Sequence, residues 1–148
     1  MAEPDGDDEH ADDSADEAAV RAANRTFYAA FEARDLDAMS DAWEHADRVS
    51  CTHPGWRTLH GWGAVSASWF ALFGGPSLLQ FILTDEVVSV AGDAAWVTVD
   101  ENLISADGAG TVAAVNVFVR TGARWRLVAH HGSIVNSPPP TFIRRDDT

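Results

Sequence analysis

The second half of the chain predicts four long strands in direct succession. Residues of strand-forming type extend over 78–90, 94–105, 111–120 and 124–134. The turn sequences AGD, ADGAG and TGA separate these four segments. Connections this short join antiparallel neighbours, so the sequence predicts a meandering antiparallel sheet.

The first half of the chain has helical spacing instead. One apolar face recurs at steps of four, three and four residues: Val20, Asn24, Phe27 and Phe31. Asp35 is an expected N-cap for a second helix, with the buried face Leu36, Met39, Trp43 and Ala46. A third helix fits residues 61–73, with Trp62, Val65, Trp69, Leu72 and Phe73 on one side. Helices followed by a sheet predict an α+β fold, a curled antiparallel sheet wrapped around three N-terminal helices.

The stretch RVSCTHPGWRTLHGW, residues 48–62, joins the second helix to the third. Val49, Cys51 and His53 alternate onto one face of a short strand, and Pro54 ends it. The concave face of a curled sheet must be filled by side chains or by a ligand. We therefore expect the His53 imidazole to point into a hollow, with Trp56 as a wall or lid beside it.

Acidic residues are concentrated at the start of the chain. The net charge is −13, and residues 1–17 hold nine of the 23 acidic residues and no basic one. We expect 1–17 to be a disordered acidic tail, 18–135 to be the folded domain, and 136–148 to be a C-terminal extension. No basic patch is apparent, so nucleic-acid binding is not expected.

Other composition features narrow the cellular and chemical context. Cys51 is the only cysteine, no apolar run is long enough to span a membrane, and the acidic start is not a signal peptide. A cytoplasmic protein without membrane contact is the simplest interpretation. All ten basic residues are arginine, which either a halophilic source or GC-rich coding would explain. Metal-binding spacings, Gly-rich phosphate loops and the GxSxG motif are missing from the sequence, so neither a metal nor a cofactor is expected.

Four motifs carry a family resemblance: FYAAFEARDLDAMSDAW, RVSCTHPGW, LHGWGAVSASW and WRLVAHHGS. In their order and spacing they resemble the nuclear transport factor 2-like superfamily, in its SnoaL-like and ketosteroid-isomerase-like branch. The resemblance covers roughly residues 18–135. It implies a cone-shaped α+β barrel with a deep pocket, and a homodimer formed through the sheet. It does not imply one reaction, because the superfamily includes enzymes and non-catalytic binding modules.

The resemblance also implies roles for single residues. His53 stands at the position of the proton-shuttling aspartate of ketosteroid isomerases, and Asn116 in VNVFVR stands near that of their oxyanion-binding aspartic acid. Their catalytic tyrosine corresponds to Phe27, which cannot donate a hydrogen bond. The adjacent Tyr28 would point about 100° away on a helix. The steroid-isomerase triad is therefore not retained.

On the last predicted strand the family pattern points to His131. Strict alternation would place it on the face of Trp125, Leu127, Ala129 and Ser133, opposite His130. Asn116 is either a pocket donor or a satisfied core group, and His53 and His131 are either functional or structural. Asp100 has a dimer-interface or surface role, or serves as a second base. The expected catalytic residues are His53, His131 and Asn116, and the expected substrate-binding residues are Trp43, Trp56, Phe27, Trp69 and Phe118.

Two function classes remain open. One is a cofactor-independent acid–base enzyme, an isomerase or dehydratase, that acts on a small apolar or cyclic molecule. In it His53 moves a proton while His131 and Asn116 polarise a carbonyl or hydroxyl group. The other is a non-catalytic ligand-binding or dimeric scaffold module built on the same cone.

Overall fold

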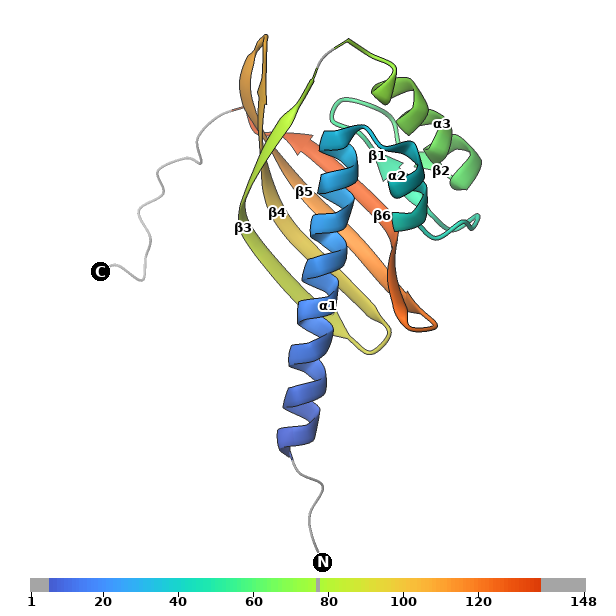
Figure 1. Cartoon of the computed structure of the whole chain (residues 1–148), viewed down its shortest axis with the longest axis vertical. Helices are drawn as coiled ribbons and strands as arrows, with labels where there is room; N and C mark the ends of the chain where they lie inside the picture. Colours follow the sequence, from blue (N-terminus) through green and yellow to red (C-terminus); the bar gives the residue numbers. More distant parts are fainter. Residues whose placement is uncertain (1–5, 77, 137–148) are drawn as a thin grey trace, which may run out of the picture.

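The computed structural model of the protein describes residues 6–76 and 78–136. The helices are α1 (Gly6–Ala33), α2 (Leu36–Ala42) and α3 (Trp62–Phe73). The strands are β1 (Ser50–Thr52), β2 (Leu59–His60), β3 (Gln80–Ala91), β4 (Ala94–Ser105), β5 (Gly108–Thr121) and β6 (Arg124–Ile134). Figure 1 shows α1 lying along the concave face of the curled sheet, with α2 and α3 beyond one edge.

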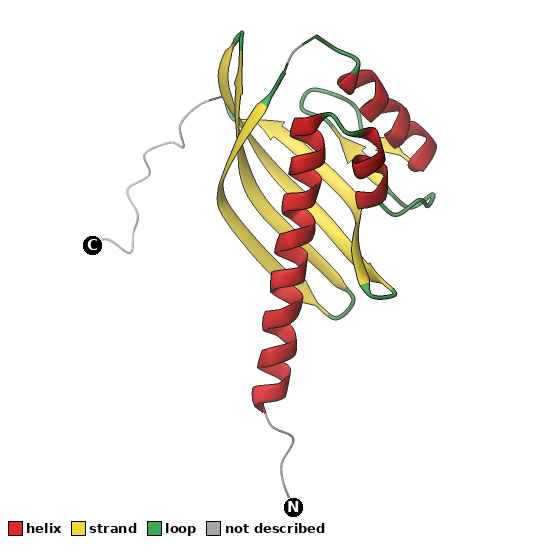
Figure 2. Ribbon diagram, in the orientation of Figure 1, coloured by secondary structure: helices red, strands yellow, loops and turns green. Residues whose placement is uncertain are grey.

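The six strands form one open sheet in the order β2-β1-β6-β5-β4-β3. Strands β3 to β6 pair antiparallel in sequence order, so the predicted meander is confirmed. The short strand β1 pairs parallel with β6, which brings the segment after it to the same edge as the end of β6. Figure 2 shows the helices gathered on one side of the sheet, as the expected α+β fold requires.

The turn between α1 and α2 follows from two residues. Arg34 adopts the left-handed conformation with φ 55°, and its successor donates its backbone N–H to the carbonyl of Ala30 at 3.0 Å. The side chain of Asp35 then accepts from the backbone N–H of Ala38 at 3.0 Å, as an N-cap does. This cap was predicted from the sequence, and it folds α2 back beside the end of α1.

Aromatic rings fill the centre of the cone. Phe27 packs edge-to-face against Trp43, Trp69 and Phe31, with ring centroids 6.5, 5.7 and 6.1 Å away. Phe118 and Leu127 close this core from the sheet side, and both are buried. The hollow that a curled sheet leaves is thus plugged at its centre, so an open cavity can only lie towards one end.

Helix α1 reaches further back than expected. It begins at Gly6, so it includes most of the segment 1–17 for which the sequence suggested disorder. Within this segment Arg120 on β5 donates to both carboxylate oxygens of Asp16, at 3.0 and 2.8 Å, as a bidentate ion pair. This pair ties an acidic turn of the helix to the sheet. Most of the proposed C-terminal extension, residues 137–148, lies outside the described residues.

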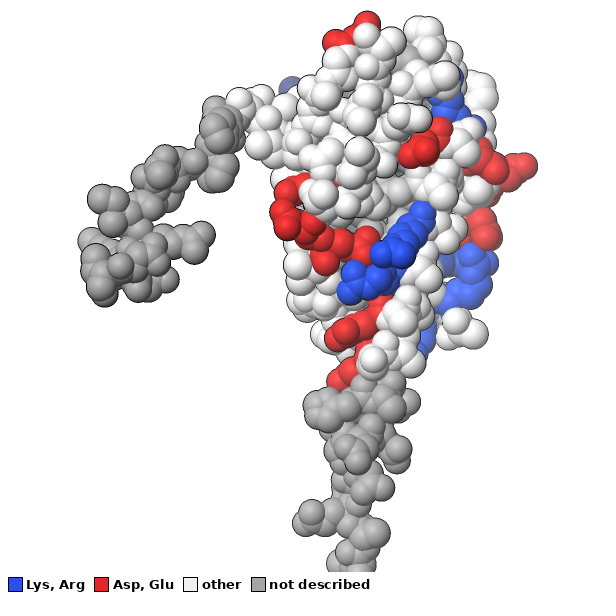
Figure 3. All heavy atoms as spheres, turned by 60° about the vertical axis from the view of Figure 1, so that its left-hand side comes forward, with Lys and Arg blue, Asp and Glu red and all other residues white. Residues whose placement is uncertain are grey.

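Charged side chains on the surface are mixed in sign. On the face in Figure 3, basic side chains lie next to acidic ones, and no extended basic area is visible there. Ion pairs such as Arg21–Glu86 and Arg124–Asp41 join opposite charges from different elements. That face offers nothing that a phosphate backbone would require.

Two β-bulges change which residues face inward. On β6 the register passes from Val117↔Ala129 to Phe118↔Leu127, so one extra residue, Val128, is inserted opposite β5. On β3 the register passes from Thr84↔Asp100 to Val87↔Thr98, and Asp85 at the bulge has φ 54°. Beyond each bulge the alternation between the two faces is reversed, because the side-chain period of a strand is two residues.

The end of β6 touches the turn that follows β1. A Cβ placed on Gly132 would lie 3.0 Å from Val112 Cγ1 and 3.2 Å from Pro54 Cγ. Gly132 is therefore the residue that lets the His53–Pro54 turn lie flat against the sheet.

Replacing Gly132 with alanine should destabilise the protein by about 1–3 kcal/mol, since the methyl group must push a strand side chain and a proline ring apart. Gly110→Ala on β5 is the matched control, because a Cβ there meets nothing within 4 Å. Urea denaturation of both variants measures the difference. Equal unfolding free energies would show that the close approach at Gly132 carries no energetic weight.

Candidate active site

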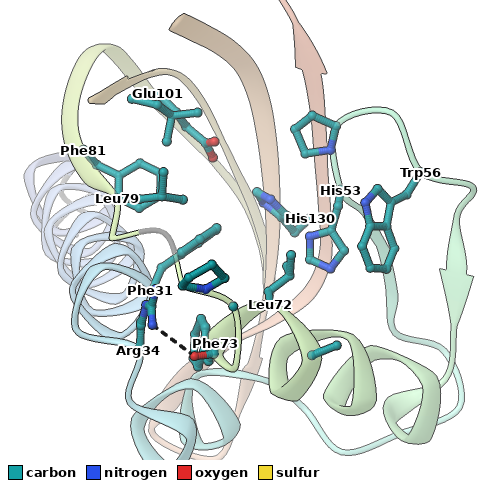
Figure 4. A pocket seen from close by; sticks show the side chains of 15 residues that line it. Phe31, Arg34, His53, Trp56, Leu72, Phe73, Leu79, Phe81, Glu101 and His130 are labelled. Atoms are coloured by element: carbon teal, nitrogen blue, oxygen red, sulfur yellow. Dashed lines mark hydrogen bonds between the residues drawn. The ribbon is translucent and has the colours of Figure 1, made fainter. Parts of the chain in front are cut away.

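A cavity of about 410 Å³ opens between the end of α1, the end of α3 and the sheet. Its wall is mostly apolar and aromatic, and its polar side chains are Arg34, His53, Glu101 and His130. In the view of Figure 4, Glu101 and His53 lie on opposite sides of the cavity, with His130 between them. Arg34 donates to the backbone carbonyl of Phe73 at 3.3 Å.

His53 is buried in the cavity wall at the end of β1, where the sequence analysis expects it. The Ser68 hydroxyl donates to the Val65 carbonyl at 2.6 Å, so it accepts from His53 Nε2–H at 2.9 Å. His53 Nδ1 is therefore the ring nitrogen without a hydrogen. Burial lowers the pKa of His53 to about 4, and the ring is neutral at pH 7.

Glu101 is the carboxylate of the site, and the sequence analysis did not single it out. It lies on the inward face of β4 and is buried. The Tyr28 hydroxyl donates a hydrogen bond to Glu101 Oε2 at 2.5 Å. Burial raises the pKa of Glu101 to about 7, although the hydrogen bond from Tyr28 acts in the opposite direction. Both protonation states are then populated near neutral pH, which suits a general acid–base group.

His130 faces inward from β6 and is buried. Its Nδ1 lies 2.5 Å from Asn116 Oδ1, which can only accept, so Nδ1 carries the hydrogen. Burial, together with the nearby imidazoles of His53 and His131, lowers the pKa of His130 to about 3. Both inward-facing histidines are therefore neutral at pH 7, and Glu101 is the group that titrates there.

The expectation that His131 lines the pocket is wrong. His131 is exposed on the outer face of the sheet, and His130 occupies the inward position. The bulge at Val128 causes this reversal: Leu127 faces inward, and the next inward residue comes three positions later instead of two. Asp100 likewise lies on the outer face, since the inward positions of β4 are Val97, Val99 and Glu101.

Asn116 lies behind the cavity wall and does not line it. It is buried, and its hydrogen bonds lead to two lining residues: directly to His130, and to Glu101 by way of the Tyr28 hydroxyl, to which its Nδ2 donates at 3.0 Å. Its side chain is thus a satisfied core group, which is one of the two alternatives that the sequence left open.

Of the five aromatic residues expected to bind substrate, Trp56 is the one that lines the cavity, with 44% of its surface exposed. Trp43, Phe27 and Phe118 are core residues instead, because their rings plug the centre of the cone. Trp69 packs edge-on against His53, with ring centroids 4.7 Å apart, and lines a separate groove between α2 and α3.

Two sequence signals could have located the missed residues. Glu101 is a single charge among Val97, Val99 and Leu103 on one face of a strand, and a lone carboxylate on an apolar face marks a buried or functional group. For Tyr28 the signal is its place on α1, next to Phe27 and about 100° from it around the helix axis. Helix α1 packs into a concave surface, so its buried face is wide enough to include both rings.

The fold and the cavity described above agree with the family that the chain matches. The SnoaL-like domain family matches residues 20–137, which is most of the chain. The chain belongs to this family. It therefore falls in the SnoaL-like branch of the NTF2-like superfamily, which confirms the resemblance seen in the sequence.

Three solved structures illustrate the similarity. A candidate dehydratase of the NTF2-like family from Streptomyces avermitilis is 40% identical, with a TM-score of 0.78 over 84% of this chain and 99% of that one. A candidate association domain of calcium/calmodulin-dependent protein kinase type II from Thiobacillus denitrificans is 38% identical, with a TM-score of 0.69 over 78% of this chain and 94% of that one. An NTF2-like protein of unknown function from Pseudomonas putida is 22% identical and shares the fold, with a TM-score of 0.72 over 81% of this chain and 87% of that one.

A curated relative is the F-box protein SKIP8 of Arabidopsis thaliana, which is 31% identical over 116 residues. The match includes 78% of this chain but 49% of the relative, so the chain spans about half the length of the curated relative it matches.

Two negative findings apply to residues 6–76 and 78–136. Among them we find no group of three or more histidine, cysteine or acidic side chains arranged to hold a metal ion. Within the same ranges, none of the helices has the length and hydropathy needed to cross a bilayer.

The raised pKa of Glu101 makes stability depend on pH in a specific direction. The folded protein binds the Glu101 proton more tightly than the unfolded chain does, so the stabilisation is present below pH 4.5 and is lost as the pH rises through about 7. Relative to Glu101→Gln, the wild type should lose ~3 kcal/mol of unfolding free energy between pH 4.5 and pH 8. Urea denaturation of both proteins across this range measures the effect. The buried histidines are common to both and cancel, and parallel pH profiles would contradict the assignment.

Proposed function

We propose that the protein catalyses a cofactor-independent isomerisation or dehydration of a small, largely apolar molecule that carries a carbonyl group. The observation that carries the proposal is Glu101, a carboxylate in an apolar cavity with a pKa of about 7. A group poised at neutral pH can take a proton and return it within one turnover. The similarity to a candidate dehydratase at 40% identity is consistent with this chemistry.

The proposed step uses Glu101 as both base and acid. Its carboxylate removes a proton from the carbon next to the substrate carbonyl, and the electron pair forms the enolate. In isomerisation the substrate also has a double bond between its β- and γ-carbons, so the enolate is a dienolate. The protonated Glu101 returns the same proton to the γ-carbon, and the double bond moves next to the carbonyl. In dehydration the protonated Glu101 gives that proton to the departing hydroxyl group, which leaves as water while the carbon–carbon double bond forms.

The other polar groups of the cavity bind and orient in this proposal. His53 has a pKa too low for an efficient base at pH 7, so it serves as a hydrogen-bond acceptor through Nδ1. Neutral His130 contributes its second ring nitrogen, and Arg34 supplies positive charge at the wall where the enolate develops. The aromatic side chains, Trp56 among them, enclose the apolar body of the substrate.

The test is proton exchange, because it requires no knowledge of the product. Cyclic ketones and β-hydroxy ketones are incubated with the protein in D2O, and loss of the α-carbon proton signal is followed by NMR. Binding is followed separately through intrinsic tryptophan fluorescence, to which Trp56 in the cavity wall should respond. For any compound that exchanges, Glu101→Gln should slow the exchange by about 100-fold or more. Asp100→Asn, on the outer face of the same strand, is the matched control and should keep the wild-type rate.

One observation favours a second candidate, a non-catalytic ligand-binding or dimeric scaffold module. The chain is also 38% identical to a protein described as a candidate association domain. Compounds that quench the intrinsic tryptophan fluorescence but exchange no faster with the wild type than with Glu101→Gln would favour this alternative.

We also propose that the protein forms a homodimer through the outer face of its sheet. Large apolar side chains are exposed there, including Val87 with 58%, Trp96 with 41% and Val115 with 39% of their surface. Neighbouring strands bring them together on one side, where a second copy could bury them.

Sedimentation velocity tests the dimer. The wild type should sediment as a dimer and Val115→Arg as a monomer, because a charge at the centre of an apolar interface is costly to bury. Phe70→Arg is the control: Phe70 is an exposed apolar residue on α3, away from the sheet, and its replacement should leave the dimer intact. A monomeric wild type would refute the proposal.

A further inference from the structure

A buried line of polar side chains leads from the surface of α1 towards the cavity. It begins at Glu86, whose Oε1 accepts from Arg21 Nη1 at 2.7 Å. Asn24 Nδ2 donates to Glu86 Oε2 at 3.2 Å, and Asn116 Nδ2 donates to Asn24 Oδ1 at 2.9 Å. Both asparagines are fully buried. Glu86 reaches this line because the bulge at Asp85 turns it inward.

Asn116 divides the line into two branches that end at the cavity. Its Oδ1 accepts from His130 Nδ1, and its Nδ2 donates to the Tyr28 hydroxyl as well as to Asn24. The Tyr28 hydroxyl donates in turn to Glu101. The two polar groups at the ends, His130 and Glu101, both line the cavity.

The Glu86 carboxylate at one end fixes the direction of every bond in this line, and at the other end Glu101 imposes no direction of its own once it is protonated, because a carboxylic acid can both donate and accept. A carboxylate only accepts, so Asn24 must present its NH2 group to Glu86 and its oxygen to Asn116. Asn116 must then donate its NH2 group to Asn24, which leaves its oxygen to face His130. An oxygen there requires a hydrogen on His130 Nδ1.

The same reasoning fixes the second branch. Because the Asn116 NH2 group donates to the Tyr28 oxygen, the Tyr28 hydrogen is directed to Glu101. Burial and the Glu101 carboxylate also raise the pKa of Tyr28 far above its usual value, so the hydroxyl keeps that hydrogen. The side chain that orients the line, Glu86, is remote from the cavity.

We propose that Glu86, Asn24 and Asn116 are positioning residues, and that the Glu86 carboxylate sets which ring nitrogen of His130 carries its hydrogen and which way the Tyr28 hydroxyl points. The importance of this arrangement for catalysis rests on the proposed function. The direction of the hydrogen bonds does not depend on that function, so an experiment can refute either proposal without the other.

The deciding variant is Glu86→Gln, which keeps shape and size. Arg21 can donate only to the amide oxygen of the introduced glutamine, so the NH2 group of that glutamine faces Asn24. Asn24 and Asn116 then both turn over, and Asn116 presents its NH2 group to His130 Nδ1 and its oxygen to Tyr28. The Tyr28 hydroxyl donates to that oxygen and accepts from Glu101, which has to carry a proton, so the spectra are recorded below pH 7. We expect the hydrogen of His130 to move from Nδ1 in the wild type to Nε2 in Glu86→Gln.

The measurement is long-range ¹H–¹⁵N correlation NMR on protein labelled with ¹⁵N-histidine, in which protonated and unprotonated ring nitrogens resonate in separate ranges. His130 is assigned through its contact with the Phe27 ring, whose centroid lies 5.1 Å away. The matched control is Glu44→Gln, which changes another partly buried glutamate paired with an arginine, Arg48, but does not touch the polar line. Its His130 signals should remain those of the wild type.

The inference would be overturned by a wild-type His130 protonated on Nε2, or by a folded Glu86→Gln whose His130 signals match those of Glu44→Gln. Asn24→Ala provides a second route, since it disconnects Asn116 from Glu86 and should give a mixture of both tautomers. Unchanged Nδ1 protonation in that variant would also count against the proposal. If the tautomer reverses as expected but no compound undergoes exchange, the proposal for the polar line is supported and the proposed chemistry is wrong.

Discussion

The hydrogen bond between Tyr28 and Glu101 is the interaction on which the site depends. It joins α1 to β4 across the inside of the cone, where an isolated carboxylate would be strongly disfavoured. Burial alone would push the pKa of Glu101 higher still, and the Tyr28 donor holds it near 7. A single contact thus makes the buried carboxylate tolerable and keeps it in the range where it can exchange protons at neutral pH.

The division of the cone into a plugged centre and an open end follows from where the large rings lie. Phe27, Trp43 and Trp69 contact one another and fill the space between α1, α2 and α3. The chain then turns away at Gly74–Gly75, so the space beyond Phe73 is not filled by a helix. The cavity lies there, and the polar groups that reach it come from strands and from the end of α1.

Much of the fold could be predicted from the sequence because the signals were local. The N-cap at Asp35, the three helical faces and the strands bounded by short turns each depend on a few neighbouring residues. The position of His53 also followed from local alternation before a proline. The residues that face the cavity from β6 could not be predicted in this way, because an inserted residue at Val128 is defined by pairing with β5. The same limit applies to β3, where the bulge at Asp85 turns Glu86 inward.

The two bulges therefore act together, although they lie on strands that are not adjacent in the sheet. One brings His130 inward beside Asn116, and the other brings Glu86 inward beside Asn24. Regular strands would have placed both side chains on the outer face, and the two asparagines would have been left buried without these partners at considerable cost. A bulge weakens its own ladder locally, so the network it completes has to offset that loss. The polar line and the irregular strands are thus one feature of the fold, and a change to either bulge should disturb both ends of the line.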